Sequence, residues 1–408
     1  MRPGIIRRIA AKEILSTLRD RRAIISNLVL PLVLLPVIMM GMPLLLGGLF
    51  NREAASQTDL AVENLAAMPA QLVQLLDRAN VSPFEAGDVI AAVRDNEAQV
   101  GLVLPEDFEA LVSEGEAAAV QVVSKMGSLS AELNASKVQG AIDGYRQQIV
   151  GERLAAVGLD PSVLNPIIIQ PVDASTDAER SSGQLSWIIP FFIAIWALAG
   201  GQMTAVDATA GEKERGTLES LLVSPVSRAE VVVGKFFATT LFSIIAAAMA
   251  IVGYVVGSMI MSNVVGSRIG GDGAEIVALM GGSLQVTPQS IVLLLVSALL
   301  LAGTISSLLL AISMFARSFK EAQTYVAPLS FLLVIPAVAL QFKDLLDLGT
   351  WIYAVPLVNA LMVMDDLVRG SIDFANLLVT WLSLLATIAV FLGLAFLNFR
   401  KENVLFRT

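Results

Sequence analysis

Three oxygen-bearing side chains near the end of one apolar stretch are the candidates for contact with an ion. Asn359, Asp365 and Asp366 follow or interrupt the apolar segment 348–364. Two adjacent carboxylates beside an amide offer the oxygen ligands that hard cations prefer. Equally, Asp365 and Asp366 could simply end a helix at the outer surface of a membrane. The sequence leaves both interpretations open, and we predict no resident metal site.

Several chemistries are excluded because the chain has no histidine and no cysteine. Ser-His-Asp hydrolysis and HExxH metalloproteolysis both need histidine. A phosphate-binding loop of the GxxxxGKS or GxxxxGKT type is also absent, since Gly234-Lys235 is followed by Phe236 and lacks the upstream glycine. We therefore expect no catalytic residue and no bound cofactor, so this chain alone should not be an enzyme.

The most specific pattern lies in a charged loop over 207–235. Thr209 with Glu212, and Ser227 with Glu230, have the spacing of helix capping boxes. These two pairs predict helix starts on both sides of a short intervening element.

That intervening element is predicted to be a short amphipathic helix between two hinges. Gly216 permits a break, and Leu218, Leu221 and Leu222 then form an apolar stripe at i, i+3 and i+4. Pro225 ends the stripe. Such a helix suits docking into a groove on a partner, although a helix lying on the bilayer would show the same spacing.

The elements that must position these residues are membrane helices. Of 408 residues, 55% are hydrophobic and 15% are charged, against about 45–50% and about 25% in soluble proteins. Charge-free windows long enough to cross about 30 Å of hydrocarbon lie at Ala23–Phe50, Ser181–Val206, Phe236–Ser267, Ile291–Met314, Ala322–Phe342 and Phe374–Phe399.

The segment 348–364 is shorter and is interrupted by Pro356 and Asn359. We interpret it as re-entrant or interfacial. The resulting organisation is an amphipathic cytoplasmic helix over 1–22, a first span over 23–50, an extracytoplasmic α/β domain over 51–180, five further spans over 181–399 including the loop 207–235, and a cytoplasmic tail over 400–408.

Orientation follows from basic residues, which are retained on the cytoplasmic side of short loops. Arginines and lysines gather at the N-terminus, in the 207–235 loop, at Arg317 and Lys320, and after the last span. We therefore expect a multi-pass protein of the cell membrane with both termini cytoplasmic and 51–180 outside.

The outer domain is predicted to mix strands and helices. A long helix is expected from Ser128 to Val157, and a helix start at Pro105 to Phe108. Candidate strands are Leu60–Val62, Val100–Leu104, Val120–Val123 and Ile167–Ile169.

Beyond these patterns, three segments carry a resemblance to a known family. The run Gly211–Arg228, followed by Gly234-Lys235, resembles the coupling loop of ABC type-2 (ABC-2) transporter permeases, in particular the sodium-export permeases of the NatB type. Val100–Phe108 is similar to a strand-then-Pro-x-x-Phe element of that family's outer domain, and Pro356–Gly370 to the segment before its last span. The turn at Lys125–Ser128 departs from the family pattern.

The resemblance implies a six-helix, type V exporter-like transmembrane domain with the α/β domain inserted after the first helix. It also implies ATP-driven export, with sodium as a candidate substrate, by two permease copies (a homodimer or a heterodimer) above separate ATPase subunits that bind ATP and Mg²⁺. The residues implied in ATPase coupling are Gly211, Glu212, Glu214, Arg215, Gly216, Thr217, Leu218, Glu219, Leu221, Leu222, Pro225 and Arg228, and Asn359, Asp365 and Asp366 are candidates for the ion path.

The N-terminal helix, over Ile5 to Leu18, is amphipathic and basic, which suits an anionic bilayer surface; in the family such a helix connects to the ATPase. The run Leu198–Gln202 superficially resembles the ATPase signature LSGGQ, but its small residues favour helix packing instead. No nucleic-acid partner is indicated. The alternative function is an ATP-independent carrier, or a membrane-anchored scaffold or sensor whose outer domain binds a partner.

Overall fold

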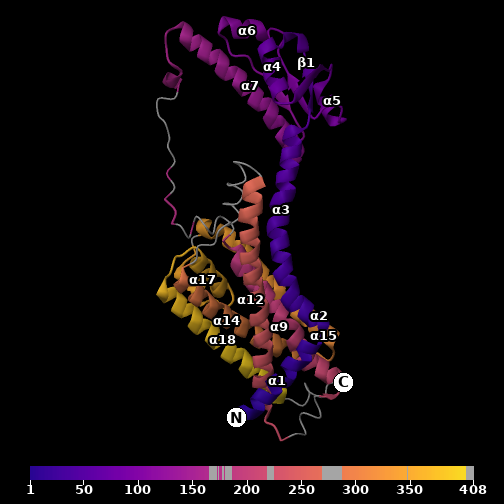
Figure 1. Ribbon diagram of the computed structural model, residues 1–408, viewed down its shortest axis with the longest axis vertical. Helices are drawn as coiled ribbons and strands as arrows, with labels where there is room; N and C mark the ends of the chain where they lie inside the picture. The colour runs from indigo at the N-terminus through magenta and orange to yellow at the C-terminus, as the bar shows by residue number, and fades with distance from the viewer. Residues whose placement is uncertain are drawn as a thin grey trace. The chain divides into compact units, whose positions relative to one another are not determined.

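The computed structural model describes residues 1–164, 172, 174–176, 179, 186–217, 225–268, 287–346 and 348–400. The chain divides into two compact units. A helical unit comprises Met1–Leu44 with Ala174–Thr408, and an α/β unit comprises Leu45–Asp173 (Figure 1).

Long apolar helices make up most of the helical unit, because charge-free runs of this length can satisfy their backbone polar groups only within a helix when they lie in lipid. Its elements in chain order are α1 (Pro3–Arg19), α2 (Arg21–Ile24), the π-helical η1 (Ile25–Val29), α3 (Leu30–Ala55), α9 (Ile188–Val206), the π-helical η4 (Asp207–Gly211), α10 (Glu212–Glu214), α12 (Arg228–Arg268), α14 (Pro288–Ser313), α15 (Phe319–Val326), α16 (Pro328–Ala339), η5 (Leu340–Leu345), η6 (Thr350–Ala354), α17 (Val358–Val368) and α18 (Phe374–Arg400).

Five helices in the described part of the chain are long and apolar enough to cross a membrane. They are Ile188–Glu214, Arg228–Ile260, Pro288–Ser313, Phe319–Leu345 and Phe374–Phe399, and each overlaps a span predicted from the sequence. For the first predicted span, the described residues give a shorter apolar helix at Ile25–Ile38. The multi-pass membrane character is therefore confirmed, while the count of six stays a prediction.

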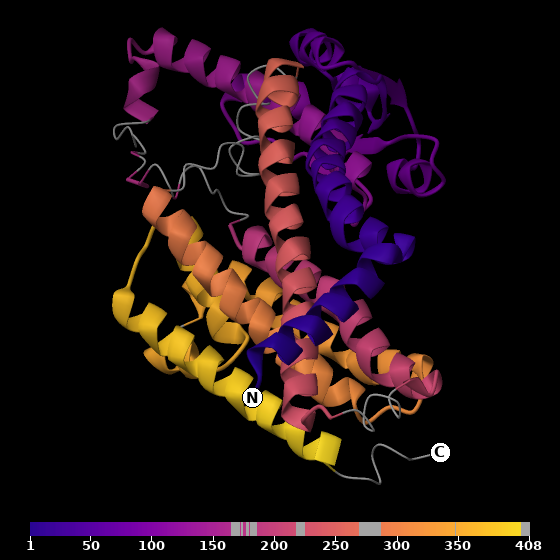
Figure 2. The same ribbon diagram turned by 60° about the horizontal axis from the view of Figure 1, so that its bottom comes forward.

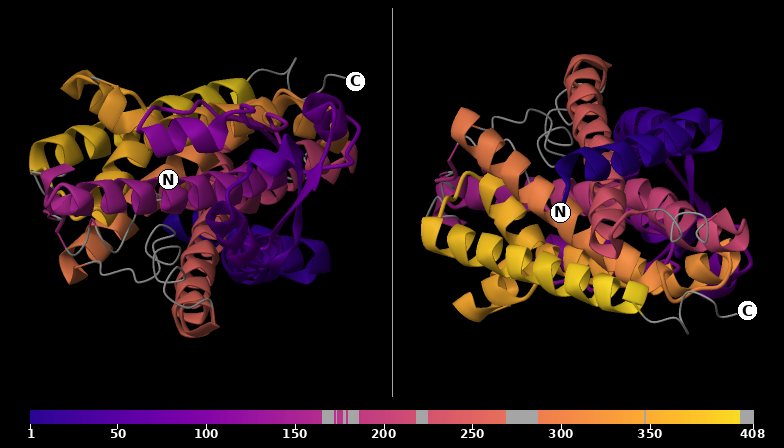
Figure 3. Two further views of the ribbon diagram at one scale, coloured as in Figure 1. Left: turned by 90° about the horizontal axis from the view of Figure 1, so that it is seen from above. Right: turned by 90° about the horizontal axis from the view of Figure 1, so that it is seen from below.

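Glycines bring α9 and α12 into close contact. A Cβ atom on Gly200 would lie 2.5 Å from the Cβ of Ala246, and one on Gly201 would lie 2.2 Å from Ser243 Oγ. The run Leu198–Gln202 therefore serves helix packing, as expected. Figure 2 and Figure 3 show α14 and α18 running side by side in the same unit, with α12 crossing beside α1.

The interrupted segment before the last helix folds as two short pieces. The 3₁₀ turn η6 is followed by Leu357, whose φ of 71° is uncommon for a non-glycine residue. The chain then enters α17, in which Asn359 and Asp365 are buried. The break predicted near Pro356 is therefore present, and α17 packs against α9, α14 and α18.

The α/β unit is built on a four-stranded sheet in the order β2-β1-β3-β4. β1 pairs in parallel with β2 and β3, and β3 pairs antiparallel with β4. The strands predicted near Leu60, Val100 and Val120 are confirmed, and β2 is an addition. The predicted strand Ile167–Ile169 lies outside the described residues. The elements are β1 (Thr58–Glu63), η2 (Leu65–Ala67), α4 (Ala70–Arg78), β2 (Val81–Glu85), α5 (Val89–Arg94), β3 (Val100–Val103), α6 (Phe108–Glu114), β4 (Gln121–Val123), α7 (Leu129–Ala156) and η3 (Pro161–Leu164).

Alternating side chains give this sheet two covered faces. Leu60 and Val62 join the larger core with residues of α4 and α7, whereas Ala61 joins a smaller core with Val89 and Val93 of α5. The long helix α7 is the one predicted over Ser128 to Val157.

Lys137 on α7 fixes the end of α3. Its ammonium donates to the main-chain oxygens of Glu53 and Ser56 and to Thr58 Oγ1. Cations suit the C-terminal end of a helix because unpaired carbonyls gather there. Asn134 adds a hydrogen bond of 2.7 Å to the carboxylate of Glu53, so the last residues of α3, which belong to the α/β unit, are attached to α7.

Candidate functional site

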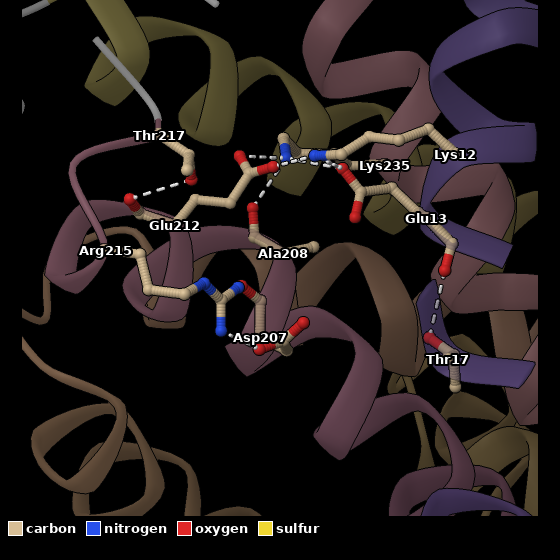
Figure 4. A network of polar contacts seen from close by, with 9 residues as sticks. All are labelled: Lys12, Glu13, Thr17, Asp207, Ala208, Glu212, Arg215, Thr217 and Lys235. Atoms are coloured by element: carbon tan, nitrogen blue, oxygen red, sulfur yellow. Dashed lines mark hydrogen bonds and ion pairs between the residues drawn. The ribbon is translucent and has the colours of Figure 1, made fainter. Parts of the chain in front are cut away.

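Four charged side chains from three separate segments meet beside α12. Lys235 Nζ lies 2.9 Å from Glu13 Oε1 of α1 and 2.6 Å from Glu212 Oε2 of α10, and it also donates to the carbonyl of Ala208 at 2.6 Å. Lys12 pairs with both carboxylates from the other side. We call Lys12, Glu13, Glu212 and Lys235 the α12 network (Figure 4).

The charged groups of this network need one another because three of the four are buried. The side chain of Lys235 is fully buried, and those of Glu13 and Glu212 are each 4% exposed. Removing one member of a buried ion pair leaves the other charge buried without a partner. This lowers the stability of the folded protein by roughly 3–5 kcal/mol. The three buried members, Glu13, Glu212 and Lys235, therefore depend on one another, and the three segments that supply them are held together.

The sequence of α1 explains why these groups meet. Ile9 and Glu13 share the buried face of α1, since residues four apart lie on one side of a helix. A Cβ on Gly234 would lie 2.8 Å from Ile9 Cβ and 3.2 Å from the carbonyl of Ile6. Glycine at 234 thus lets α1 approach α12 closely, one position before Lys235.

Lys12 is the half-exposed member, with 55% of its side chain accessible. Burial lowers its pKa, but the carboxylates of Glu212 and Glu13 outweigh that cost and hold the pKa above its ordinary value. Lys12 therefore stays charged throughout the physiological range.

The described start of the predicted coupling loop continues α9 instead of beginning a new helix. Thr209 Oγ1 donates to Ala205 O at 2.7 Å, as in a helix interior, so the capping box predicted for Thr209 and Glu212 is wrong. The chain passes from α9 through the π-helical η4 into α10 without a break. Glu212 is buried inside this chain as a result.

The remaining loop residues contact neighbouring helix ends. Glu214 Oε2 accepts a hydrogen bond of 2.8 Å from the main-chain nitrogen of Phe319. Arg215 pairs with Asp207 at 2.8 Å. Lys213 donates to the carbonyls of Met314 and Ala316 between α14 and α15.

Gly216, where the sequence predicted a break, takes a φ of 68°, in the left-handed region that glycine tolerates. Gly211 lies within η4, where a Cβ would meet Asp207 Oδ1 at 2.9 Å, and Thr217 donates to the carbonyl of Glu212 at 3.3 Å. Leu218, Glu219, Leu221 and Leu222 lie outside the described residues.

On the other side of the loop, α1 contacts the start of α12. Ser227 and Glu230 form the predicted capping box, with Ser227 N donating to Glu230 Oε2 at 2.9 Å and Glu230 N to Ser227 Oγ at 3.2 Å. Arg2 pairs with Glu230 at 3.1 Å and donates to Pro225 O at 2.6 Å. Arg228 donates to Phe399 O of α18 at 3.2 Å.

A second polar cluster surrounds the predicted ion-path carboxylates. Asp365 Oδ1 accepts a hydrogen bond of 2.9 Å from Ser186 just before α9, and Asp365 Oδ2 lies 3.0 Å from Arg369 Nε. Lys343 contacts both Asp365 and Asp366. We call Lys343, Asp365, Asp366 and Arg369 the α17 network.

Further polar groups complete this region. Tyr353 Oη donates to Asp366 Oδ2 at 2.8 Å, and Asn359 Nδ2 donates to Tyr353 O at 3.0 Å. Asn359 is therefore linked to Asp366 indirectly, through Tyr353. Burial raises the pKa of Asp366 above its ordinary value, although Lys343 and Tyr353 beside it act in the opposite direction.

The α17 network already supplies each carboxylate with a cation from this chain. Lys343 forms ion pairs with both aspartates, and Arg369 forms ion pairs with Asp365 and with the exposed Asp344. Within the described residues, no group of three or more metal-ligating side chains is arranged to hold a metal ion. The expectation that these two aspartates end a helix on the outer surface does not fit Asp365, which is fully buried.

Sequence reasoning missed the roles of Lys12, Glu13 and Lys235. A signal was present in Glu13, an acidic residue on the apolar face of an amphipathic helix, and in Lys235, which directly precedes an apolar span. Neither signal names its partner, because Glu13 and Lys235 lie far apart in the chain.

Comparison with known proteins agrees with the early resemblance. The model of the family described as "ABC-2 family transporter protein" matches residues 28–397. The ABC transporter permease protein NatB of Bacillus subtilis (strain 168) is 27% identical over 396 residues, which cover 97% of this chain and 98% of that protein. With its apolar spans and near full-length match, this chain belongs to the ABC-2 transporter family as a permease subunit of an ABC transporter.

Proposed function

We propose that this permease subunit is driven by a separate ATPase that binds residues 211–228, and that the α12 network passes the motion of this loop into the membrane helices. The observation that carries the proposal is the buried pairing of Glu212 with Lys12 and Lys235. It ties the start of the loop to α1 and α12 at once.

Further contacts extend this mechanical link. Lys213 and Glu214 hold the connection between α14 and α15, while Arg2 joins α1 to Pro225 and Glu230 on the far side of the loop. A partner that displaces the loop therefore displaces the ends of four helices together. The continuous backbone from α9 into α10 adds α9 to this set.

The proposed assembly contains two permease copies and two ATPase subunits, with ATP and Mg²⁺ held by the ATPase. Six spans in a type V arrangement, cytoplasmic termini and an extracytoplasmic α/β unit complete the proposal. The apolar helices and the family membership support it. Leucines 218, 221 and 222 supply the apolar ridge for the partner's groove.

We propose sodium as the exported ion on the strength of the resemblance to sodium-export permeases. The α17 network is the candidate path, because its two carboxylates are adjacent and one is fully buried. Lys343 holds the position between them that a cation would take. An ion that binds there must therefore displace the Lys343 ammonium.

The ATPase contact is tested by Leu221→Asp and Leu222→Asp. A charge on the apolar ridge should abolish co-purification with the ATPase, because a desolvated carboxylate has no partner in an apolar groove. Ser220→Asp is the matched control, since it adds the same charge in the same loop off the stripe. Membrane insertion should be unchanged in all three variants, and an intact complex with Leu221→Asp and Leu222→Asp would overturn the assignment.

The transport step is tested in sealed vesicles that contain both subunits. ATP-dependent movement of radiolabelled sodium supports an exporter, and ATP-independent movement supports the alternative of a carrier. A complex that hydrolyses ATP without any sodium flux would rule out sodium as the substrate and leave the ATPase coupling in place.

A further inference from the structure

The α/β unit contains a pocket of about 380 Å³, within the range of about 300–1,000 Å³ common for small-molecule sites. It lies between α6, α7 and the segment 116–120, and most of its lining is apolar. Its principal apolar side chains are Phe108, Val112, Val120, Ile142 and Ile149.

These side chains are not fully used by the protein core. Val112, Val120, Ile142 and Ile149 are only partly buried and pack around the main core of the unit. Apolar surface that stays accessible in a concave site can be covered by a ligand, and removing that surface from water favours binding.

The walls of the pocket are held in place by Arg153. Its guanidinium extends from α7 to the carbonyls of Val112 and Gly115 at the end of α6. Gly115 takes a φ of 91° there, which turns the chain into the segment that forms the third wall. The pocket is therefore preformed, and a ligand need not order it.

The four charged side chains that line the pocket sum to no net charge. Arg146 pairs with Asp143 at 3.0 Å, Arg153 is engaged by carbonyl oxygens, and Glu116 balances its charge. Tyr145 also lines the pocket, and among the described residues its hydroxyl has no hydrogen-bond partner. The site offers apolar surface and one free hydroxyl, with no net charge to attract an ion.

We propose that this pocket binds an uncharged, largely apolar small molecule that carries one hydrogen-bonding group for the hydroxyl of Tyr145. The site is separate from the ATPase-coupling loop and from the α17 network, because every residue that lines it lies between Leu72 and Arg153. The proposal therefore stands or falls independently of the proposed function.

The absence of native cysteine allows a selective experiment. Ala118→Cys, at the pocket wall, is labelled with a trifluoromethyl reagent in the full chain in lipid nanodiscs and followed by fluorine NMR. Phenylnaphthylamine, which is uncharged and has one N–H group, should produce a saturable shift of the label. Anilinonaphthalenesulfonate, the same ring system with a negative charge, should bind at least tenfold more weakly.

Controls separate pocket binding from partition into lipid. Glu97→Cys, an exposed position away from the pocket, should show no saturable shift. Adding Ile142→Trp to the Ala118→Cys chain should abolish saturation by filling the pocket. The milder Tyr145→Phe should weaken binding several-fold while the shift of the unliganded label stays unchanged. A shift that is non-saturable or equal at both labelled positions, or a sulfonate that binds as tightly as the amine, would refute the proposal.

Discussion

The α12 network and the α17 network lie at opposite ends of α9, and they are built in different ways. Glu212 follows the C-terminal end of α9, and Ser186, which contacts Asp365, precedes its N-terminal end. The 19 residues of α9 span about 28 Å, at 1.5 Å per residue, and η4 adds a further turn before Glu212. This is close to the hydrocarbon thickness of a bilayer.

The two networks differ in which parts of the chain they join. The α12 network connects α1, α10 and α12, and two of its ion pairs join residues 200 or more positions apart. The charged members of the α17 network all come from residues 343–369. The first therefore binds separate helices to one another, whereas the second mainly staples one short segment. A partner that moves the loop can therefore move several helices together through the α12 network.

The largest effect is expected from Lys235→Met. Glu13 and Glu212 would stay buried without their central cation, so stability should fall by roughly 3–5 kcal/mol. Thermal unfolding of the purified permease measures this loss, and ATPase stimulation should be lost as well.

Lys12→Met is the control for this variant, because Lys12 contacts the same two carboxylates but is half exposed. Its effect should be much smaller, since solvent screens an exposed pair. Equal losses of stability in Lys235→Met and Lys12→Met would show that the burial of Lys235 does not make it more important than the exposed Lys12.

An intermediate effect is expected from Asp365→Asn. In this variant Lys343 still pairs with Asp366 and Arg369 still pairs with Asp344. The new amide oxygen can also accept the hydrogen bond from Ser186. The free energy of unfolding should therefore fall by only about 1.5–3 kcal/mol. Asp344→Asn removes a carboxylate that is 77% exposed and should change stability little. If Asp365→Asn destabilised the protein more than Lys235→Met, the contrast between the two networks would be reversed.

The smallest effect is expected from pH acting on Asp366. Because burial raises its pKa, the folded state binds more protons than the unfolded state between the ordinary value of about 3.9 and the raised one. The contribution of this group to stability is therefore fully present below about 3.9 and is lost as pH rises through the raised pKa. The difference in melting temperature between Asp366→Asn and the parent chain, measured across the acidic range, should show this slope. A flat difference would mean that Asp366 titrates normally.

Much of the helical architecture could be predicted because charge-free windows mark the spans and charges mark their ends. The capping box of Ser227 and Glu230 was also predictable, since both partners lie within one turn. The strand β2 was not, because a proline at position 83, in the middle of this run, argues against a strand. Its position at the edge of the sheet explains how proline is tolerated there.

The candidate site was predicted only in its local parts. The positive φ at Gly216 follows from one residue, whereas the start of the loop at Asp207 was wrong, because helix continues through Glu214. The pairing of Glu212 with Lys235 and Lys12 depends on how α1 packs against α12, which no local pattern contains. The false capping box at Thr209 has the same origin, since tertiary pairing of Glu212 outweighed a local spacing rule.

The π-helical turn η4 sets the direction in which Glu212 faces. A π turn holds one residue more than an α turn, so every side chain after Gly211 is rotated by about 100° relative to an uninterrupted α-helix, which has 3.6 residues per turn. Glu212 meets Lys235 in this rotated phase. Removal of one residue from Asp207–Gly211 would turn the carboxylate toward a different neighbour, so the single extra residue sets the rotational phase between the body of α9 and the loop.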